Sequence, residues 1–347
     1  MGKKTTMQDI ADKLNITKVS VSKALNNQPG ISITLRQQIS DMAKQMGYSK
    51  VKSINELSKD GYNFAFICPK RFFLKDETFY TTIYYYINKQ CVSQGYGLTC
   101  FIINNREEED LEIPEKLLNE KFNGIFIAGE FIADYLKKLD ELNFAKIAID
   151  FYNEELRMDS IVVDNFYTSF EVTNFLIKNG HKEIGFVGNI FDTSSICDRY
   201  FGYVKALTLN HLPVRDDWNL VNNDFSGTYT SDFDLPDDLP SAFMCHCDKS
   251  AFMLIQKLES CGIKVPSDVS VVSFDNTSIC ELITPKLTSV NIDKKEFGLK
   301  SVDQMINRLN NSDEPFKKIY LKSNLIIRDS VVKFHECSKE VALGKEN

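Results

Sequence analysis

The sequence contains little histidine and lacks the short motifs of common enzymes. It contains four histidines and one tryptophan, and neither a G-x-S-x-G nucleophile motif nor a Walker phosphate-binding loop. Its nine cysteines form no C-x-x-C pair and mostly lie on apolar runs, which predicts reduced, buried thiols in a cytoplasmic protein. No apolar run reaches membrane-spanning length, and the N-terminus lacks the apolar stretch of a signal peptide. We therefore expect no enzyme, no cofactor and no membrane or secreted protein.

One short segment, Cys245-His246-Cys247, combines metal-ligand residue types. A structural zinc site uses four ligands, and two thiols at alternate positions of a strand leave two ligands that the spacing does not supply. We expect no metal site there.

The first fifty residues predict three short helices. Thr6 and Asp9 have the spacing of a capping box, Asn15 tolerates the left-handed backbone of a tight turn, and Thr17 is the expected cap of the second helix. Apolar residues at helical intervals predict the packed faces: Ile10, Ala11 and Leu14; then Val21, Ala24 and Leu25; then Ile31, Leu35, Ile39, Met42, Ala43 and Met46, with Gly47 ending the third helix.

The distribution of charge favours DNA as the partner of these helices. Residues 1–61 hold ten Lys or Arg against five Asp or Glu, whereas the rest of the chain carries a net charge of −12. Spacing alone fits an ordinary corner of a helical bundle equally well, but a basic head on an acidic body is typical of a nucleic-acid-binding module. The second-helix side chains that project away from the packed face are then expected to meet bases or phosphates: Thr17, Lys18, Val19, Ser22 and Lys23.

From Tyr62 onward, short apolar runs alternate with amphipathic segments, which is typical of doubly wound parallel α/β sheets. The predicted strands are 64–68, 98–103, 124–128, 146–150, 160–163, 183–188, 242–245, 269–274, 286–291, 318–322 and 324–328. The predicted helices are 81–95, 114–122, 133–142, 168–179, 199–210, 250–262 and 296–309. Two similar halves imply two lobes with a cleft between them.

Nearly the whole chain resembles the lactose-repressor (LacI) family of bacterial transcription regulators. Residues 9–26 read D-I-A-D-K-L-N-I-T-K-V-S-V-S-K-A-L-N, followed by I-S-I-T-L-R at 31–36 and M-G-Y at 46–48. This is similar to the family pattern D-V-A-x-x-A-G-V-S-x-x-T-V-S-R-V-L-N, V-S-x-x-T-R and L-G-Y. The resemblance implies that Lys18 and Val19 read bases in the major groove, with Lys23 replacing an arginine. The hydroxyl groups expected to face phosphates are those of Thr17, Ser20 and Ser22, and Thr6 and Asn26 complete the expected DNA contacts.

Residues 49–61 are expected to form a hinge. Ser53 and Glu56 again have capping-box spacing, and the resemblance implies that Leu57 wedges into the minor groove when two subunits meet on DNA. Ile54 and Asn55 stand where the family usually has alanine and arginine, so a plain flexible linker is the alternative.

The resemblance also implies a core similar to periplasmic sugar-binding proteins, in which the chain crosses between lobes three times, here near Val163, Asn291 and Ser323. The expected domains are a helix-turn-helix domain (1–48), the hinge (49–61), an N-terminal lobe (62–162 with 292–322), a C-terminal lobe (163–291 with 323–331) and a polar tail (332–347). The tail has no leucine heptads, which favours a homodimer over a tetramer.

Ligands of open α/β sheets bind beyond the carboxyl ends of the strands. There, the resemblance implies that Phe79 or Tyr80 packs on a sugar face, unless both are core residues, and that Arg199 and Asp275 bind effector hydroxyl groups. Further expected contacts are Asp150, Cys247, Asp248 and the stacking ring of Phe225, for which Trp218 is the alternative.

Two departures from the family pattern alter this cavity. Cys247-Asp248 replaces an Asn-Asp pair, and a thiol cannot reproduce the two-way hydrogen bonding of an amide. Residues 226–241 are too short and too proline-broken for the helix that most relatives place there. Both departures favour an open edge and a larger or unusual effector.

Together these features predict a DNA-binding transcriptional repressor that binds a palindromic operator as a homodimer, under the control of a small effector, a sugar or glycoside. The alternatives are control by a protein corepressor or by a non-sugar ligand such as a purine. A sugar-processing enzyme with a DNA-binding head is a third hypothesis, which only turnover would reveal.

Overall fold

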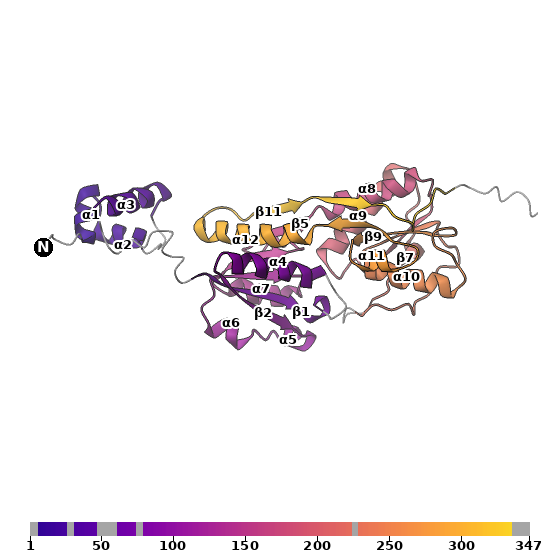
Figure 1. Cartoon of the computed structure of the whole chain (residues 1–347), viewed down its shortest axis with the longest axis horizontal. Helices are drawn as coiled ribbons and strands as arrows, with labels where there is room; N and C mark the ends of the chain where they lie inside the picture. The colour runs from indigo at the N-terminus through magenta and orange to yellow at the C-terminus, as the bar shows by residue number, and fades with distance from the viewer. Residues whose placement is uncertain (1–5, 26–30, 47–60, 74–78, 224–227, 335–347) are drawn as a thin grey trace, which may run out of the picture. The chain divides into compact units, whose positions relative to one another are not determined.

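The computed structural model describes residues 6–25, 31–46, 61–73, 79–223 and 228–334. The chain divides into two compact units, Met1–Tyr62 and Asn63–Asn347. The first unit contains α1 (Met7–Leu14), α2 (Lys18–Leu25) and α3 (Ile33–Gln45) (Figure 1). Its core is made of the buried side chains Ile10, Ala11, Val21, Ala24, Ile39 and Ala43. The three predicted helices are therefore confirmed.

Local hydrogen bonds explain where α1 and α2 begin and end. The side chain of Thr6 accepts from the N–H of Asp9, whose carboxylate accepts from the N–H of Thr6 at 2.7 Å. Asn15 ends α1 with φ 55° and ψ 44°, the left-handed conformation. Thr17 Oγ1 then accepts from the N–H of Ser20 at 3.1 Å. The predicted capping box, turn and cap are confirmed, and Gly47 lies outside the described residues.

The N-terminal lobe of the second unit is a parallel sheet in the order β11-β5-β4-β3-β1-β2. Its strands are β1 (Asn63–Pro69), β2 (Gly97–Ile103), β3 (Gly124–Ala128), β4 (Ala145–Ile149), β5 (Asp159–Val163) and β11 (Lys318–Leu321). Alternate strand residues face opposite layers. Ile67 and Ile125 pack on the face covered by α6 (Glu115–Asn119) and α7 (Ala133–Glu141). Phe66 points to the other face, where its ring centre lies 5.1 Å from that of Tyr84 in α4 (Phe79–Ser93). Helix α12 (Lys294–Asn310) packs beside α4 (Figure 1).

The C-terminal lobe is a second sheet in the order β12-β10-β9-β8-β6-β7. Its strands are β6 (Ile184–Val187), β7 (Asn219–Leu220), β8 (Ala242–Cys245), β9 (Ser270–Asp275), β10 (Thr288–Ile292) and β12 (Ser323–Ile326), of which β12 alone runs antiparallel. Helices α8 (Asn165–Lys178) and α9 (Ser194–Leu209) lie against each other, and Gly202 permits this because a Cβ there would lie 2.1 Å from the Phe166 carbonyl oxygen. Helices α10 (Asp248–Ser260) and α11 (Ile279–Leu282) cover the opposite face.

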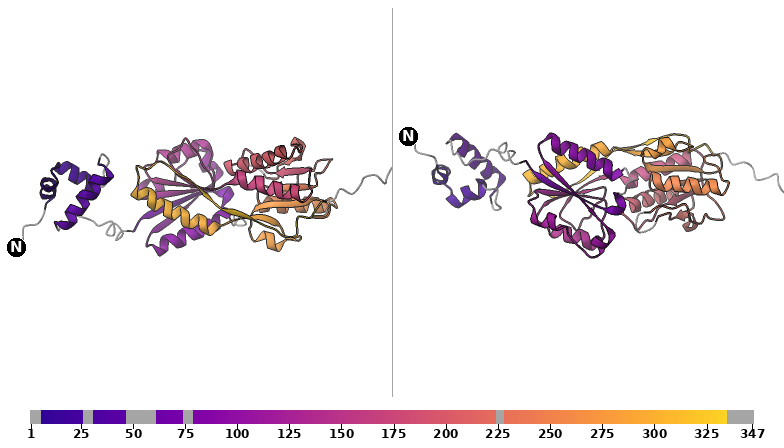
Figure 2. Two further views of the ribbon diagram at one scale, coloured as in Figure 1. Left: turned by 90° about the horizontal axis from the view of Figure 1, so that it is seen from above. Right: turned by 60° about the horizontal axis from the view of Figure 1, so that its bottom comes forward.

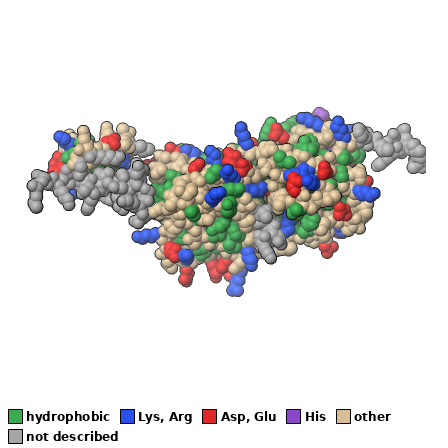
Figure 3. Space-filling view, viewed as in Figure 1, with side chains coloured by type: hydrophobic (Ala, Val, Ile, Leu, Met, Phe, Trp, Pro, Cys, Tyr) green, Lys and Arg blue, Asp and Glu red, His purple; other side chains and the backbone are tan. Residues whose placement is uncertain are grey.

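Three crossings join the lobes: after β5, after β10, and between β11 and β12 (Figure 2). They occur near Val163, Asn291 and Ser323, as predicted. A hinge made of three short connections permits the lobes to rotate as rigid bodies. On the face shown in Figure 3, acidic and basic side chains are interspersed over this unit. No helix among the described residues is long and apolar enough to cross a membrane.

Several element predictions needed correction, among them the start of α8, which is Asn165 rather than Thr168, and the short elements α11 and β7, which were not predicted. Helix α9 begins at Ser194 rather than Arg199, because Thr193 caps it by accepting from the N–H of Ile196. Helix α5 (Asn105–Glu109) was not predicted, although Asn104 and Glu107 form a capping box at its start. The described part of the 226–241 segment contains no helix, as its length and prolines predicted.

Candidate DNA-reading helix and interlobe cavity

Helix α2 presents a polar and partly apolar face to solvent. Val19 in its first turn is 63% exposed, which is unusual for a β-branched apolar residue, and Lys18 and Lys23 are exposed beside it. Arg36 of α3 donates from Nη1 to the carbonyl oxygen of Ala24 at 3.1 Å and so satisfies one of the last carbonyls of α2. The helix is thus fixed from behind while its outer face stays open.

The other residues expected to contact DNA have more local roles in this structure. Thr17 and Ser20 hydrogen-bond each other through their hydroxyl groups at 2.9 Å, and Thr6 Oγ1 donates to the Asp9 carboxylate at 2.7 Å. Ser22 lies half-buried on α2. Asn26 and Leu57 lie outside the described residues.

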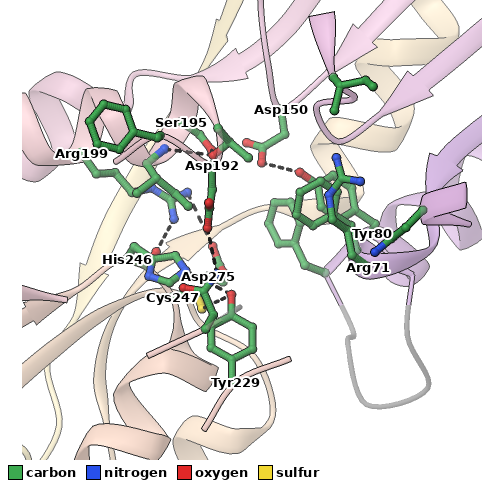
Figure 4. A pocket seen from close by; sticks show the side chains of 18 of the residues that line it. Arg71, Tyr80, Asp150, Asp192, Ser195, Arg199, Tyr229, His246, Cys247 and Asp275 are labelled. Carbon is green, nitrogen blue, oxygen red and sulfur yellow. Dashed lines mark hydrogen bonds and ion pairs between the residues drawn. The ribbon is translucent and has the colours of Figure 1, made fainter. Parts of the chain in front are cut away.

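A cavity of about 370 Å³ lies between the two lobes of the second unit. Its lining includes six of the eight residues expected to bind an effector (Figure 4). These are Phe79, Tyr80 and Asp150 from the N-terminal lobe, and Arg199, Cys247 and Asp275 from the C-terminal lobe. Phe225 lies outside the described residues, and Asp248 does not line the cavity.

Asp150 follows β4 in a left-handed conformation with φ 68°, which turns its side chain into the cavity. The residue is 6% exposed, and its Oδ2 accepts a hydrogen bond from the Tyr80 hydroxyl at 2.9 Å. Burial raises the pKa of this carboxyl group to about 6, although the positive charge of Arg199 opposes the rise. Within the described residues, Oδ1 has no hydrogen-bond partner.

Arg199 is the central cation of the C-terminal half of the cavity. Its Nε donates to Asn165 Oδ1 at 2.8 Å, and its Nη1 donates to the carbonyl oxygen of His246. Its Nη2 lies 3.7 Å from Asp275 Oδ1, and the guanidinium group stacks 4.4 Å from the ring centre of Phe274. These contacts hold the guanidinium plane rigidly at the cavity wall.

Asp275 is the last residue of β9, whereas Asp150 directly follows β4, and its φ of 99° again turns the chain sharply at a strand end. Burial raises the pKa of Asp275 to about 7, with Arg199 opposing the rise and the negative charge of Asp248 adding to it. Lys294, at the start of α12, donates from Nζ to the backbone oxygen of Asp275 and so links the lobes.

Asp248 has a structural role instead of the predicted ligand contact. It is 1% exposed, and Oδ1 accepts from Ser273 and Ser289 at 2.7 and 2.6 Å. Its Oδ2 accepts from the N–H and hydroxyl groups of Thr277 at 2.6 and 2.9 Å. The carboxylate therefore ties the start of α10 to β9 and β10, and no oxygen remains directed at a ligand.

Cys247 and its neighbours form the floor of the cavity. Cys247 caps α10, its Sγ accepting from the N–H of Ser250 at 3.4 Å. His246 donates from Nδ1 to the carbonyl of Val187, so Nε2 accepts from the Tyr229 hydroxyl at 3.1 Å. Burial lowers the pKa of His246 to about 4, which keeps the ring neutral. Both ring nitrogens are thus occupied by protein groups rather than offered to a metal.

Trp218, the alternative stacking residue, does not line the cavity. Its ring is buried beneath the guanidinium group of Arg215, and its Nε1 donates to the backbone oxygen of Asp238 at 2.7 Å. Phe79 lines the cavity but is 6% exposed and packs against Phe297, whereas Tyr80 and Phe72, which also line it, are half-buried.

The sequence did not reveal several lining residues, above all Arg71 and Glu108. Arg71 forms a paired ion bridge with Glu108, with Nη2 to Oε1 at 3.1 Å, and donates to the Glu130 backbone oxygen at 2.8 Å. Both stand just beyond a strand end, after β1 and β2, so the strand-end rule that selected Asp150 also applies to them. From the other lobe, Asp192, Ser195, Asn223 and Tyr229 also line the cavity.

The fold and site define a class: a two-lobed ligand-binding core attached to a helix-turn-helix DNA-binding head. Residues 173–331 match the periplasmic binding protein-like domain. Along 94% of its length the chain is 24% identical to the HTH-type transcriptional repressor PurR of Actinobacillus pleuropneumoniae, and 27% identical to the NTD biosynthesis operon regulator NtdR of Bacillus subtilis. These alignments cover 98% and 99% of the two relatives.

Solved structures agree with this class. A CelR–cellobiose complex superposes with a TM-score of 0.67 at 19% identity, covering 94% of this chain and 100% of that one. The lac repressor dimer bound to operator and the anti-inducer ONPF gives 0.65 at 18% identity, covering 95% and 100%. These comparisons support the predicted assignment to the LacI family of transcription regulators. Its relatives are transcriptional repressors and regulators, which supports a DNA-binding regulator.

Proposed function

We propose that this protein is a repressor that binds a palindromic operator as a homodimer and is governed by a sugar or glycoside in the interlobe cavity. The observation that carries the proposal is the cavity itself. It brings together two strand-end aspartates, a buried arginine and an aromatic wall from both lobes. Carboxylates and guanidinium groups hydrogen-bond hydroxyl groups, and aromatic rings pack on the apolar face of a sugar.

The lobes give a route from ligand to DNA. Asp150 and Tyr80 belong to one lobe, and Arg199 and Asp275 belong to the other. A bound ligand would therefore contact both lobes, which the three connections of the hinge join. A contact between lobes already exists where Glu130 Oε2 accepts from the N–H of Ser194, at 2.6 Å, at the start of α9. Closure on a ligand would change the orientation of the N-terminal lobe, which is continuous in sequence with the DNA-binding unit.

The small size of the DNA-binding unit, in which α2 is the candidate DNA-reading helix, is the physical reason for dimerisation. One α2 helix reaches only a few base pairs, and two-fold symmetry doubles that into a palindromic site. The relatives whose names specify repression, and the lac repressor dimer on its operator, support this assignment.

The proposal is tested by isothermal titration calorimetry with mono- and disaccharides, purine bases and a phosphorylated carrier protein. A second assay measures binding to DNA fragments selected from a random pool. We expect selection of a palindrome and binding of at least one saccharide that changes the affinity for it. Binding of a purine or of the carrier protein, with no response to any saccharide, would replace the sugar as effector and leave the DNA-binding function intact.

A further inference from the structure

The two arginines of the cavity are already paired by the protein. Arg71 is bridged by Glu108 through both terminal nitrogens, and its remaining bond goes to the Glu130 backbone. Arg199 is held by Asn165, by the His246 carbonyl and by Asp275. Neither guanidinium group is therefore a free anchor for a phosphate or carboxylate of a ligand.

Negative charge remains after this pairing. Among the described lining residues, Asp150, Asp192 and Glu109 have no ion pair with a lysine or arginine. Asp192 accepts only from neutral amides, Asn189 at 2.6 Å and Asn223 at 2.8 Å. Glu109 is exposed and so is screened by water. The excess of carboxylates in a buried or half-buried setting, where screening is weaker, therefore comes from Asp150 and Asp192.

One of these carboxylates points to the ligand directly. Asp150 is only 6% exposed, Tyr80 occupies its Oδ2, and its Oδ1 has no hydrogen-bond partner among the described residues. Figure 4 shows this side chain directed into the space between the lobes. A buried carboxylate oxygen without a donor is costly, which marks it as a position that a ligand donor completes.

On the basis of the proposed function, we propose that the effector is an amino sugar whose protonated amine binds Oδ1 of Asp150. Its hydroxyl groups then contact Arg199, Asp275 and Tyr80. A neutral hydroxyl group would satisfy the hydrogen bond but leave the carboxylate excess uncompensated. An ammonium group satisfies the hydrogen bond and also compensates the negative charge, and the attraction between opposite charges is strong at a buried site.

The test compares saccharides with the same ring that carry a neutral, cationic, acetylated or anionic group: D-glucose, D-glucosamine, N-acetyl-D-glucosamine and D-glucose 6-phosphate, with the same four forms of other hexoses and of disaccharides. Calorimetric titration of the full-length protein at pH 7 and low ionic strength gives the affinity for each. We expect the best ligand to be an amine that binds at least tenfold more tightly than its neutral and N-acetylated counterparts. A neutral or phosphorylated sugar that binds as tightly as its amine overturns the inference but leaves the sugar-governed repressor standing. Failure of every saccharide overturns both.

A substitution at Asp150 separates a charged from a neutral ligand donor. Asp150→Asn removes the negative charge and keeps one oxygen acceptor for the Tyr80 hydroxyl group. Its NH2 group then faces the ligand, where it can donate to a hydroxyl oxygen but cannot bond an ammonium group. We expect the substitution to weaken the amine more than thirtyfold and the neutral counterpart less than threefold. The matched control is Asp134→Asn on the exposed surface of α7, which should change neither affinity. Equal losses for amine and neutral sugar in Asp150→Asn contradict the inference.

Discussion

At the scale of single residues, Asp150 is both the proposed ligand contact and a source of instability above about pH 6. Its carboxyl group lies close to Tyr80, Arg199 and Glu130, of which only Arg199 favours ionisation strongly by its charge. The folded protein holds the proton more tightly than the unfolded chain, because burial raises the pKa of this group from 3.8 to about 6. The free energy of unfolding that this group contributes is thus fully present at low pH and is lost as the pH rises through about 6.

Asp150→Asn removes that loss, since the amide stays neutral at every pH. We expect the variant to be more stable than the wild type at pH 7.5 by about 3 kcal/mol, because each tenfold difference in proton affinity between the folded and unfolded chain corresponds to about 1.4 kcal/mol. The difference should vanish near pH 4. Urea unfolding of the ligand-free protein across this range measures it, and a destabilised variant at pH 7.5 would show that the carboxylate is better solvated than its burial indicates.

A second prediction at the scale of single residues concerns Lys23 on α2, the candidate DNA-reading helix. An exposed lysine that contacts a phosphate contributes to affinity through counterion release, so Lys23→Ala should reduce the slope of log K against log salt by about 1. Fluorescence anisotropy with a selected DNA site between about 50 and 200 mM salt gives the slope. The matched control is Lys137→Ala on α7 of the second unit, for which an unchanged slope is expected. A Lys23→Ala slope identical to wild type would place this residue away from the phosphates.

At the scale of elements, Asp248 holds three segments of the C-terminal lobe together. Its four hydrogen bonds join α10 to Ser273 and Ser289 in the sheet and to Thr277 beyond β9. Asp248→Ala leaves these buried hydroxyl groups without an acceptor and should lower the free energy of unfolding by about 2–4 kcal/mol. Thermal and urea unfolding measure the loss, with the exposed Asp237→Ala as control. A loss no larger than that of the control would show that the hydroxyl groups find other acceptors.

The elements also show how far the sequence leads. Periodicity and capping residues predicted the three helices and most strands, because those signals act within a few neighbours along the chain. Cys247 and Asp248 show the limit: both follow β8, but α10 begins at Asp248, so one side chain faces the cavity and the other the interior. The ion bridge between Arg71 and Glu108 joins residues 37 positions apart, and no local pattern indicates such a pairing. Only their shared position after neighbouring strands would have suggested it.

At the scale of the whole molecule, the proposed function requires one equilibrium that connects the two units. Ligand binding between the lobes and operator binding by two DNA-binding units are coupled only if the lobes adopt two arrangements with different DNA affinity. Glu130 and Ser194 lie at the contact between lobes, which makes them a place to bias that equilibrium.

Glu130→Ala removes the acceptor at the start of α9 from the opposite lobe. We expect this contact to belong to the closed, ligand-bound arrangement. The variant should then bind the effector several-fold more weakly. Without effector, it should bind the operator as tightly as the ligand-free wild type does. Calorimetry and anisotropy report the two affinities separately. An unchanged effector affinity would show that the contact persists in both arrangements.

A thermodynamic cycle of effector and operator on the full-length protein tests the ligand-governed switch itself. The affinity for the selected operator is measured with and without a saturating cavity ligand, and the affinity for that ligand is measured with and without operator. We predict that both change by the same factor, within the range of about 5- to 150-fold typical of allosteric coupling. A ligand that fills the cavity, loses affinity in Asp150→Asn, and leaves operator affinity unchanged would contradict a DNA-binding switch governed by this cavity.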